Sequence, residues 1–307
     1  MNAREWFLKA KTEGWAIGAF NVDNLDIFRA VCEAAKKKKS PVMLELSQGE
    51  VGYFGLANIV DLVENAKAEY GIPILLNLDH AKFVEDCLAA IAISGGPSTH
   101  SVRSGSTIPS ESPSFDDVHF DGSDLPIEEN ITNTKKVVEA AHAEGLLVEG
   151  EIDRVSGSSE VHNEDIDIDL LKKSYTDPEK AAKFVSETQI DIFASVFGNV
   201  HGTFPNQPDL DLELLRKIRE TLPNTFLSMH GGSGIPAKQV KEAIKVGKIV
   251  KINVNTELRQ AYKDALVEEL GENPNEYTYY KLTPDIIESV MAVVEGKIEV
   301  FGSGGKA

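Results

Sequence analysis

The sequence is poor in the residues that mark several classes of protein. It has two cysteines in 307 residues, too few for a disulfide framework or a thiolate metal site. Basic residues are also scarce, since 31 Lys and Arg stand against 49 Asp and Glu, and the longest basic run is Lys36–Lys39. A net charge of −18 repels phosphate backbones and anionic lipids. We therefore expect no nucleic acid and no membrane among its partners.

Long apolar stretches are missing as well. None approaches the ~18–20 residues that cross a bilayer. The first thirty residues lack the basic and apolar segments of a signal peptide. A content of 42% hydrophobic and 26% charged residues is ordinary for a soluble globular chain. We expect a cytoplasmic protein.

Eight short apolar runs alternate with segments of helical period. Most are too short for buried helices and rich in β-branched residues, Leu or Phe. They cover residues 16–22, 41–47, 73–79, 116–122, 146–152, 191–197, 225–231 and 249–255. Strands that alternate with helices pair in parallel. The count fits an α/β protein with one (β/α)8 TIM barrel over residues 1–307, and an open doubly wound sheet is the alternative.

Polar residues at the ends of these runs favour the barrel. They are Asn21, Ser47, Asp79, His80, Asp121, Ser123, Glu149, Glu151, His201, His230, Asn253 and Asn255. A closed barrel brings all strand ends to one rim, where barrel enzymes hold their active sites. An open sheet would scatter the same residues along a crevice.

Three of the seven histidines, His80, His201 and His230, lie at predicted strand ends, and the others look peripheral. Three imidazoles can bind Zn²⁺ and leave one position open for substrate, although each could also be a hydrogen-bonded rim residue. Asp79 beside His80 is a candidate general base or merely a helix cap. Glu151, on the same strand face as Glu149, could approach the metal.

A glycine-rich turn, His230–Pro236, precedes a predicted helix at 237–246. Backbone N–H groups at such a turn and helix terminus favour phosphate, and barrels often bind phosphate after strands seven and eight. The same sequence could form a simple turn. Asn253, Asn255 and Thr256 supply neighbouring donors, so we expect a phosphorylated substrate.

Taken together, these motifs resemble the class II, zinc-dependent fructose-bisphosphate aldolases. The resemblance covers nearly the whole chain in order and is highly specific. It is carried by Ala19-Phe20-Asn21, Leu78-Asp79-His80, Asp121-Gly122-Ser123, Val148-Glu149-Gly150-Glu151, Phe197–Gly202, His230–Gly234 and Lys251–Thr256.

The resemblance implies a role for each matching residue. His80, His201 and His230 match zinc ligands, Glu151 a carboxylate near the zinc, and Asp79 the acid/base residue. Asn253 matches a group that steadies the enediolate, and Asn21 and Ser47 look like substrate-side residues. The positions that match those holding the ketose 1-phosphate and a monovalent cation (Na⁺ or K⁺) are Gly202, Gly231, Ser233, Asn255 and Thr256.

The implied reaction is cleavage of fructose 1,6-bisphosphate to dihydroxyacetone phosphate and glyceraldehyde 3-phosphate, a step of glycolysis and gluconeogenesis. The acidic, Ser/Gly-rich segment 153–169 is expected to be a lid that excludes water, with Glu160 as its catalytic carboxylate. Tagatose 1,6-bisphosphate or a ketose 1-phosphate is the alternative substrate. A Schiff-base aldolase that uses Lys251 and a non-catalytic sugar-phosphate-binding barrel are further alternatives.

Three departures from the family pattern concern the distal phosphate and the assembly. Pro205 stands where the family usually has Lys, and Tyr277–Lys281 stands where it usually has an Arg that reaches the distal phosphate. Residues 94–114 form an apparent flexible insertion in which Arg103 could replace that contact. A helical extension at 260–307 is expected to meet a neighbouring subunit in a homodimer or homotetramer.

Overall fold

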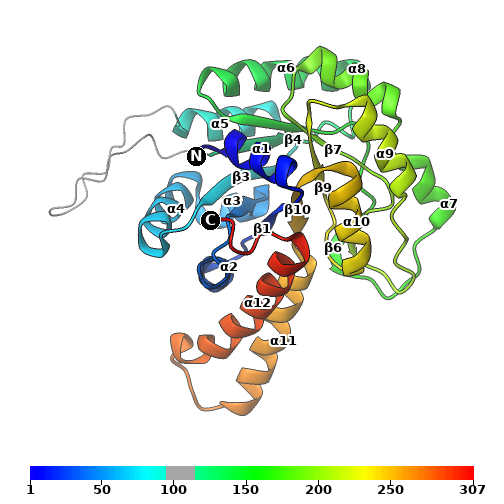
Figure 1. Cartoon of the computed structure of the whole chain (residues 1–307). Coiled ribbons are helices and arrows are strands. Elements are labelled where there is room, and N and C mark those ends of the chain that lie inside the picture. Colours follow the sequence, from blue (N-terminus) through cyan, green and yellow to red (C-terminus); the bar gives the residue numbers. More distant parts are fainter. Residues whose placement is uncertain (95–114) are drawn as a thin grey trace.

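The computed structural model describes residues 1–94 and 115–307 (Figure 1). The expected insertion therefore lies outside the described residues, apart from Ser94 at the end of a helix, and so does Arg103.

Eight parallel strands close into a barrel in the order β1-β10-β9-β7-β5-β4-β3-β2. Each coincides with one of the eight predicted runs, and only β3 extends past its run, by two residues: β1 Ile17–Asn21, β2 Val42–Leu46, β3 Ile74–Ala81, β4 Asp117–Phe120, β5 Leu147–Gly150, β7 Ile192–Ala194, β9 Phe226–Met229 and β10 Ile249–Val254. Closure rests on β1, which pairs with β2 through Gly18–Val42 and with β10 through Ile17–Lys251. The predicted (β/α)8 barrel is confirmed, and the open sheet is wrong.

Helices cover the outside of the barrel and connect successive strands (Figure 1). Side-chain caps fix where several begin: Asn24 accepts a hydrogen bond from the Ile27 N–H, and Asp177 accepts from Lys180 N–H. The helices up to β10 are α1 Ala3–Glu13, α2 Leu25–Lys38, α3 Gln48–Phe54, α4 Leu56–Tyr70, α5 Val84–Ser94, α6 Ile127–Ala143, α7 Ile168–Leu171, α8 Pro178–Thr188, α9 Leu212–Thr221 and α10 Ala237–Gly247, with a 3₁₀ turn at Lys172–Ser174.

The N-terminal end of the barrel is filled by apolar side chains and covered by α1. Phe7 of α1 is fully buried, and its ring centroid lies 5.6 Å from that of Phe226 on β9. The inward-facing residues Ile17, Met43 and Leu75 belong to the same apolar cluster. This end is a packed core, so substrate chemistry is confined to the opposite end.

The middle of the barrel interior is charged. Lys251 is fully buried; its Nζ lies 2.8 Å from Glu45 Oε1 and 3.9 Å from Asp117 Oδ2, and it also contacts Glu149. Burial opposes the charge on Lys251, but these carboxylates raise its pKa well above the ordinary value. Lys251 is therefore a protonated, ion-paired ammonium beneath the active site.

A short parallel sheet beside the barrel was not expected from the sequence. It pairs β6, Gly157–Val161, with β8, His201–Thr203. The segment predicted to be a lid thus contains a strand. His201 was expected at the end of the barrel strand at 191–197, but β7 ends at Ala194 and His201 begins β8. Residues 195–200 connect the two strands.

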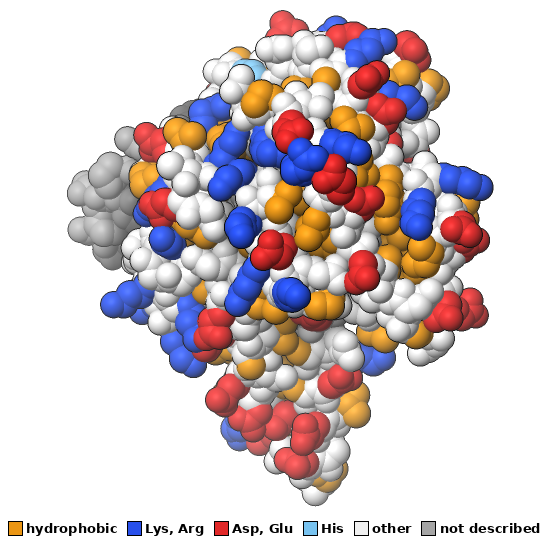
Figure 2. Space-filling view, turned by 45° about the vertical axis from the view of Figure 1, so that its right-hand side comes forward, with side chains coloured by type: hydrophobic (Ala, Val, Ile, Leu, Met, Phe, Trp, Pro, Cys, Tyr) orange, Lys and Arg blue, Asp and Glu red, His pale blue; other side chains and the backbone are white. Residues whose placement is uncertain are grey.

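The C-terminal extension is a helical hairpin of α11, Thr256–Glu272, and α12, Tyr279–Phe301. Its outer end projects away from the barrel, and α12 returns along α2 (Figure 1). Acidic side chains gather on the projecting end, at the bottom of Figure 2. Among the helices of the described residues, none has the length and apolar character of a bilayer-spanning segment.

Candidate active site

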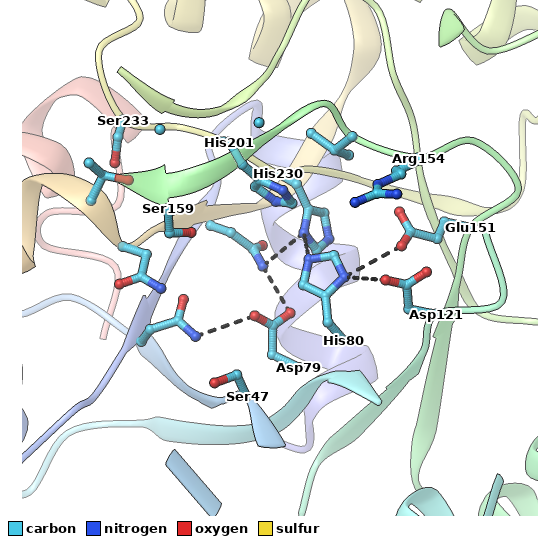
Figure 3. A pocket seen from close by; sticks show the side chains of 18 of the residues that line it. Ser47, Asp79, His80, Asp121, Glu151, Arg154, Ser159, His201, His230 and Ser233 are labelled. Carbon is cyan, nitrogen blue, oxygen red and sulfur yellow. Dashed lines mark hydrogen bonds and ion pairs between the residues drawn. The ribbon is translucent and has the colours of Figure 1, made fainter. Parts of the chain in front are cut away.

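A cavity of about 300 Å³ lies at the carboxyl ends of the barrel strands (Figure 3). It is lined by residues from the ends of β1, β2, β3, β4, β5, β9 and β10, as the convergence of strand ends predicts. The predicted residues that line it are Asn21, Ser47, Asp79, His80, Glu151, His201, Gly202, His230, Gly231, Ser233, Asn253, Asn255 and Thr256. One cavity thus holds every predicted site residue except Glu160.

Two histidines face each other in this cavity. His230 Nδ1 lies 3.0 Å from His80 Nε2. The second nitrogen of each ring meets a carboxylate: His230 Nε2 lies 2.8 Å from Glu149 Oε1, and His80 Nδ1 lies 2.9 Å from Asp121 Oδ2. A neutral ring that donates to a carboxylate has its lone pair on the other nitrogen. Burial opposes the charge on His80, but Asp79 and Asp121 raise its pKa well above the ordinary value, so without a metal the protonated ring can donate from Nε2 to His230 Nδ1. A metal ion that replaces this proton would lie between the two lone pairs.

His201 approaches this pair from β8. Its ring centroid lies 5.2 Å from that of His80 and 6.0 Å from that of His230. Burial, together with the positive charge of its neighbours, lowers the pKa of His201 well below the ordinary value. Burial also lowers the pKa of His230 to about 4. Both rings are neutral at pH 7, which is the state that binds a metal.

His119 was expected to be peripheral, and that interpretation is wrong. The side chain lies in the middle of β4 and is fully buried. Its Nδ1 is 3.5 Å from Asp79 Oδ1, and its ring centroid is 4.6 Å from that of His80. The missed signal was the alternation Asp117, His119, Asp121, which puts all three polar residues on the inward face of one strand.

Asp79 lies beside the histidines and is 4% exposed. Asn253 Nδ2 lies 3.3 Å from its Oδ1, and Asn21 Nδ2 lies 3.3 Å from its Oδ2. Burial would raise the pKa of Asp79, but the positive charge of His80 and a hydrogen bond from His119 lower it on balance. The carboxylate is therefore ionised, directed into the cavity and able to accept a proton.

Glu151 follows β5 on the opposite side of His80 from Asp79 (Figure 3). Its Oε1 lies 3.4 Å from His80 Nδ1, and its Oε2 has no hydrogen-bond partner among the described residues. Burial raises the pKa of Glu151 to about 7. A buried carboxylate oxygen without a partner is costly unless it meets a cation or a substrate hydroxyl.

The glycine-rich turn forms the end of the cavity farthest from Asp121 and Glu151 (Figure 3). Gly231 has φ +65°, and a Cβ there would lie 1.9 Å from the carbonyl oxygen of Val200, so the position requires glycine. The sequence predicted a helix N-terminus at 237, but the helix that reaches the cavity is α11, through Thr256 at its start. Its free N–H groups favour a phosphate here.

The chain matches the family described as fructose-bisphosphate aldolase class-II over residues 1–306. It belongs to this family. It is 35% identical to the fructose-bisphosphate aldolase of Streptococcus pneumoniae serotype 4, over 100% of this chain and 99% of that protein. Identity to the fructose-bisphosphate aldolase of Geobacillus stearothermophilus is also 35%, over 100% and 98%. The solved structure of the YdjI aldolase from Escherichia coli K12 is similar, with TM-score 0.79 and 29% identity over 100% and 98% of the chains.

Class II aldolases are metal-dependent lyases of carbon–carbon bonds, and the donor set fits a metal. Two groups bring their potential ligand atoms within 4.8 Å of one another: Asp79 with His80, His119 and His230, and His80 with Asp121 and Glu151. Nitrogen and carboxylate donors of this kind suit Zn²⁺ and similar divalent ions.

Lys251 cannot act as the Schiff-base nucleophile of a different aldolase class. It does not line the cavity, and its ammonium is held by buried carboxylates. Schiff-base formation requires a neutral amine that reaches the substrate carbonyl. The Lys251 alternative is therefore wrong for this class II aldolase.

Other predicted residues lie outside the cavity. Glu160 is exposed, whereas Gly157 and Ser159 of the same strand line the cavity. Side chains alternate along a strand, so Glu160 faces away, and its predicted catalytic role has no support in this arrangement. Lys281 is exposed and lies 3.1 Å from Glu276 rather than at the cavity.

Sequence reasoning missed three cations of the cavity, Lys82, Arg154 and Arg259. Each lies in a helix or loop that follows a barrel strand, where no motif distinguishes it from a surface cation. Arg259 is on the first turns of α11, only three residues after Thr256. This spacing could have indicated that Arg259 lies near the cavity, because residues three apart on a helix, here Thr256 and Arg259, lie on the same face.

Proposed function

We propose that this class II aldolase uses Zn²⁺ to cleave fructose 1,6-bisphosphate to dihydroxyacetone phosphate and glyceraldehyde 3-phosphate. The observation that carries the proposal is the convergence of His80 Nε2 and His230 Nδ1, 3.0 Å apart, beside the ionised Asp79. Two zinc ligands in a tetrahedral site are roughly 3.3 Å apart, as Zn–N bonds of about 2.0–2.1 Å require. His201 is the third ligand in this proposal. The Glu151 carboxylate, 3.4 Å from His80 Nδ1, is a further group that could bind the metal.

The side chains around the proposed metal site have separate roles in the cleavage reaction. When bound, Zn²⁺ would polarise the C2 carbonyl of the ketose. Asp79 takes the proton of the C4 hydroxyl, and the C3–C4 bond breaks. Asn253, whose Nδ2 already points at Asp79, donates a hydrogen bond to the oxygen on which negative charge develops. Asn21 donates a hydrogen bond to the other carboxylate oxygen of Asp79. Ser47 lines the same cavity, where it can contact the substrate.

The C1 phosphate would bind at the opposite end of the cavity. Backbone N–H groups of the glycine-rich turn and of the α11 N-terminus converge there with the hydroxyls of Ser233 and Thr256. Gly202 and Asn255 complete the phosphate site, and their carbonyl and amide oxygens are suitable ligands for a monovalent cation, Na⁺ or K⁺. Such a cation would balance part of the phosphate charge.

A ketose 1-phosphate is a second candidate substrate, because the cavity cations already have partners. Arg259 is bonded to Asp23, with Nε–Oδ2 at 2.7 Å, and its Nη2 lies 3.0 Å from Glu50 Oε1. Lys82 lies 2.7 Å from Asp121 Oδ2. A distal phosphate would have to compete with these carboxylates. A hydroxyl at the same position would not.

We further propose that the enzyme is cytoplasmic and works as a homodimer or homotetramer. The projecting α11–α12 hairpin exposes apolar side chains that a monomer would leave in water: Val267 is 64% exposed and Leu270 51%. A second copy could cover them in a two-fold interface. Light scattering of the active protein tests this, and a fully active monomer would contradict it.

A turnover assay on a panel of ketose phosphates tests the activity. Release of dihydroxyacetone phosphate is measured with fructose 1,6-bisphosphate, tagatose 1,6-bisphosphate and fructose 1-phosphate, each with and without a chelator. We expect cleavage that the chelator abolishes and Zn²⁺ restores. No release from any of the three, or release that the chelator leaves unchanged, would overturn the proposal.

A further inference from the structure

Glu50 is a buried carboxyl group that lies behind the wall of the cavity without lining it. It belongs to the first turn of α3, and its side chain is 5% exposed. Its two oxygens nevertheless bond to three residues that do line the cavity. Oε2 accepts hydrogen bonds from the backbone nitrogen of Ser47 at 2.5 Å and from Asn21 Nδ2 at 3.2 Å. Oε1 accepts one from Arg259 Nη2 at 3.0 Å.

A helix cap accounts for only one of these contacts. Ser47 and Glu50 form the capping box at the start of α3, in which the carboxyl group reaches back to the Ser47 N–H. The bonds to Asn21 and Arg259 join Glu50 to β1, 29 residues earlier, and to α11, 209 residues later. Burial of a carboxyl group is costly unless it is hydrogen-bonded, and the cap alone does not require it.

Asn21 connects Glu50 to the proposed base. Its amide nitrogen, Nδ2, lies 3.2 Å from Glu50 Oε2 and 3.3 Å from Asp79 Oδ2. An amide NH₂ group has two hydrogens, so one can point at each carboxyl group. Both acceptors therefore favour the same orientation of the amide, with its nitrogen toward Asp79. Without Glu50, the Asn21 side chain would keep only one of these two anchors.

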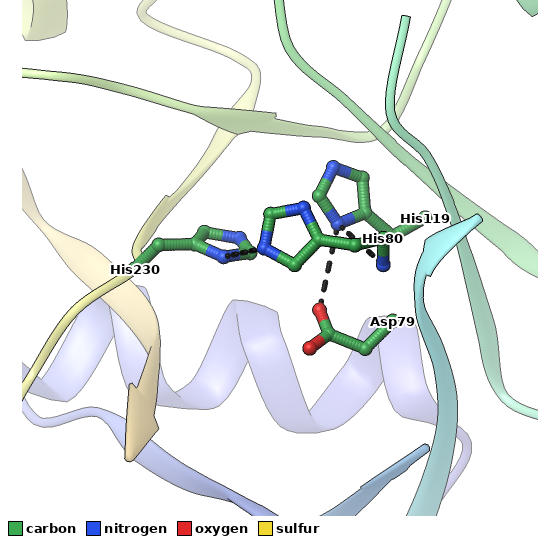
Figure 4. A group of neighbouring side chains, drawn as sticks. All are labelled: Asp79, His80, His119 and His230. Carbon is green, nitrogen blue, oxygen red and sulfur yellow. Dashed lines mark hydrogen bonds and ion pairs between the residues drawn. The ribbon is translucent and has the colours of Figure 1, made fainter. Parts of the chain in front are cut away.

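The two oxygens of Asp79 are held unequally. Oδ1 lies 3.3 Å from Asn253 Nδ2 and 3.5 Å from His119 Nδ1 (Figure 4). For Oδ2, the hydrogen-bond donor among the described residues is Asn21. The direction of Oδ2 thus depends on the position of the Asn21 amide. A misplacement of about 1 Å in a reacting group can cost about a hundredfold in rate.

We propose that Glu50 is a positioning residue of the aldolase, which acts through Asn21 to hold the Asp79 carboxylate in the orientation that receives the substrate proton. This inference rests on the proposed function, in which Asp79 is the base. Glu50 does not line the cavity, so it would not touch the substrate itself. Its loss should slow bond cleavage and leave the binding of the C1 phosphate unchanged.

Steady-state kinetics of the zinc-loaded enzyme with fructose 1-phosphate test the proposal, because this substrate has no distal phosphate that could bind Arg259. Glu50→Leu should lower kcat by about tenfold to a hundredfold and change KM by less than about threefold. Glu50→Gln keeps an oxygen that can accept from Asn21, so its kcat should stay within about threefold of the wild-type value. A role confined to capping α3 would not separate kcat from KM in this way.

Asp23→Asn is the matched control. Asp23 bonds to the same guanidinium of Arg259, at 2.7 and 2.9 Å, and among the described residues it has no hydrogen bond to Asn21. Both kinetic constants should stay within about twofold of the wild-type values. In a double-mutant cycle, Glu50→Leu should have no further effect on kcat in the Asn21→Ala background, because it acts through that side chain. Glu50→Ala replaces Glu50→Leu if circular dichroism shows that the latter does not fold.

The proposal is overturned if loss of the Glu50 carboxyl group leaves kcat at the wild-type level, or if Glu50→Gln loses as much as Glu50→Leu. It is also overturned if the effects of the Glu50 and Asn21 substitutions simply add. A crystal structure of the Glu50→Leu holoenzyme gives a readout apart from turnover. We expect the Asn21 amide to have moved beyond hydrogen-bonding distance of Asp79 Oδ2.

This crystal structure separates the positioning role from the aldolase proposal. If the wild type cleaves no ketose phosphate but the Asn21 amide moves in Glu50→Leu, the function fails and the link between Glu50 and Asp79 stands. If the wild type cleaves ketose phosphates but the amide stays on Asp79 in the variant, the link fails and the function stands.

Discussion

Glu149 accepts a hydrogen bond from Nε2 of His230 at 2.8 Å, and this contact decides which nitrogen of the ring faces the cavity. With the proton held on Nε2, the lone pair of His230 lies on Nδ1, opposite His80. The positive charge of Lys251, on the other carboxylate oxygen of Glu149, keeps that carboxylate ionised. Lys251 and Glu149, in the charged middle of the barrel interior, thus determine which nitrogen of His230 can bind a metal.

Glu149→Gln should therefore weaken metal binding by about tenfold to a hundredfold, the usual effect of losing a carboxylate behind a metal-ligating histidine. The amide can turn its NH₂ toward His230 and force the proton onto Nδ1. The Kd for Zn²⁺, measured by competition with a chelating dye, checks this. Glu45→Gln is the matched control, because it also removes a carboxylate from Lys251 but contacts no histidine. Equal losses in both variants would show that charge, not the tautomer of His230, controls affinity.

Asp79 and His230 should fail in different ways. His230→Ala removes one of the three proposed zinc ligands and should lose metal and turnover together. Asp79→Asn keeps the three histidines, so it should retain one metal ion and lose on the order of 10²–10⁴ in turnover, as expected for a general base. Metal content measured on the same samples as the rate distinguishes the two. Normal turnover in Asp79→Asn would assign the base to another residue.

The barrel and most of the cavity were predictable because each polar residue of the rim ends an apolar run of the right length. His80, His230 and Asn253 lie at such ends, and alternation within a strand makes their direction certain once the barrel is closed. These positions depend only on local periodicity and on the convergence of parallel strands. No knowledge of distant contacts is needed.

Other features depend on contacts that no local pattern reveals. His119 lies inside β4, so the pattern of polar residues at strand ends does not include it. His201 reaches the cavity from β8, which exists only because it pairs with Gly157–Val161, some forty residues earlier. Arg259 and Glu50 meet at 3.0 Å across 209 residues, a pairing that only the closed barrel brings about.

The distal end of the substrate should be recognised weakly. Lys281 does not reach the cavity, and Arg259 is held by Asp23 and Glu50. We expect kcat/KM for fructose 1,6-bisphosphate to exceed that for fructose 1-phosphate by less than about a hundredfold, or two decades of 1.4 kcal/mol each. Lys281→Ala should leave the ratio unchanged within about twofold. Arg259→Gln should lower it only if the guanidinium exchanges a carboxylate for the phosphate.

The result that contradicts this is a large preference for the bisphosphate that survives both substitutions. A ratio above about a thousandfold would then place the distal phosphate on another group. Arg154, which lines the cavity and is 72% exposed at its side chain, is the next position to change. Its 3.4 Å contact with Asp124 is long enough to be displaced easily.

Glu50 should make the stability of the enzyme depend on pH. Burial, and then a hydrogen bond shared with Asp23, raise the pKa of Glu50 to about 8 from an ordinary value of 4.5. Between these two values the folded protein holds a proton that the unfolded chain has released. The free energy of unfolding therefore falls as pH rises through this window. The contribution of Glu50 between pH 6 and pH 8 is at most roughly 2 kcal/mol.

Glu50→Gln removes this titration but keeps a side chain of the same size that can still bond to Asn21 and Arg259. Its free energy of unfolding, from urea titrations of the metal-bound enzyme, should fall less between pH 6 and pH 8 than that of the wild type. Burial also raises the pKa of Glu45 to about 7, and it titrates in the same direction in both proteins, so the difference between them reports Glu50. Glu139→Gln, an exposed change on α6, controls for a simple loss of surface charge. Parallel slopes for wild type and Glu50→Gln would mean that Arg259 keeps Glu50 ionised across the whole range.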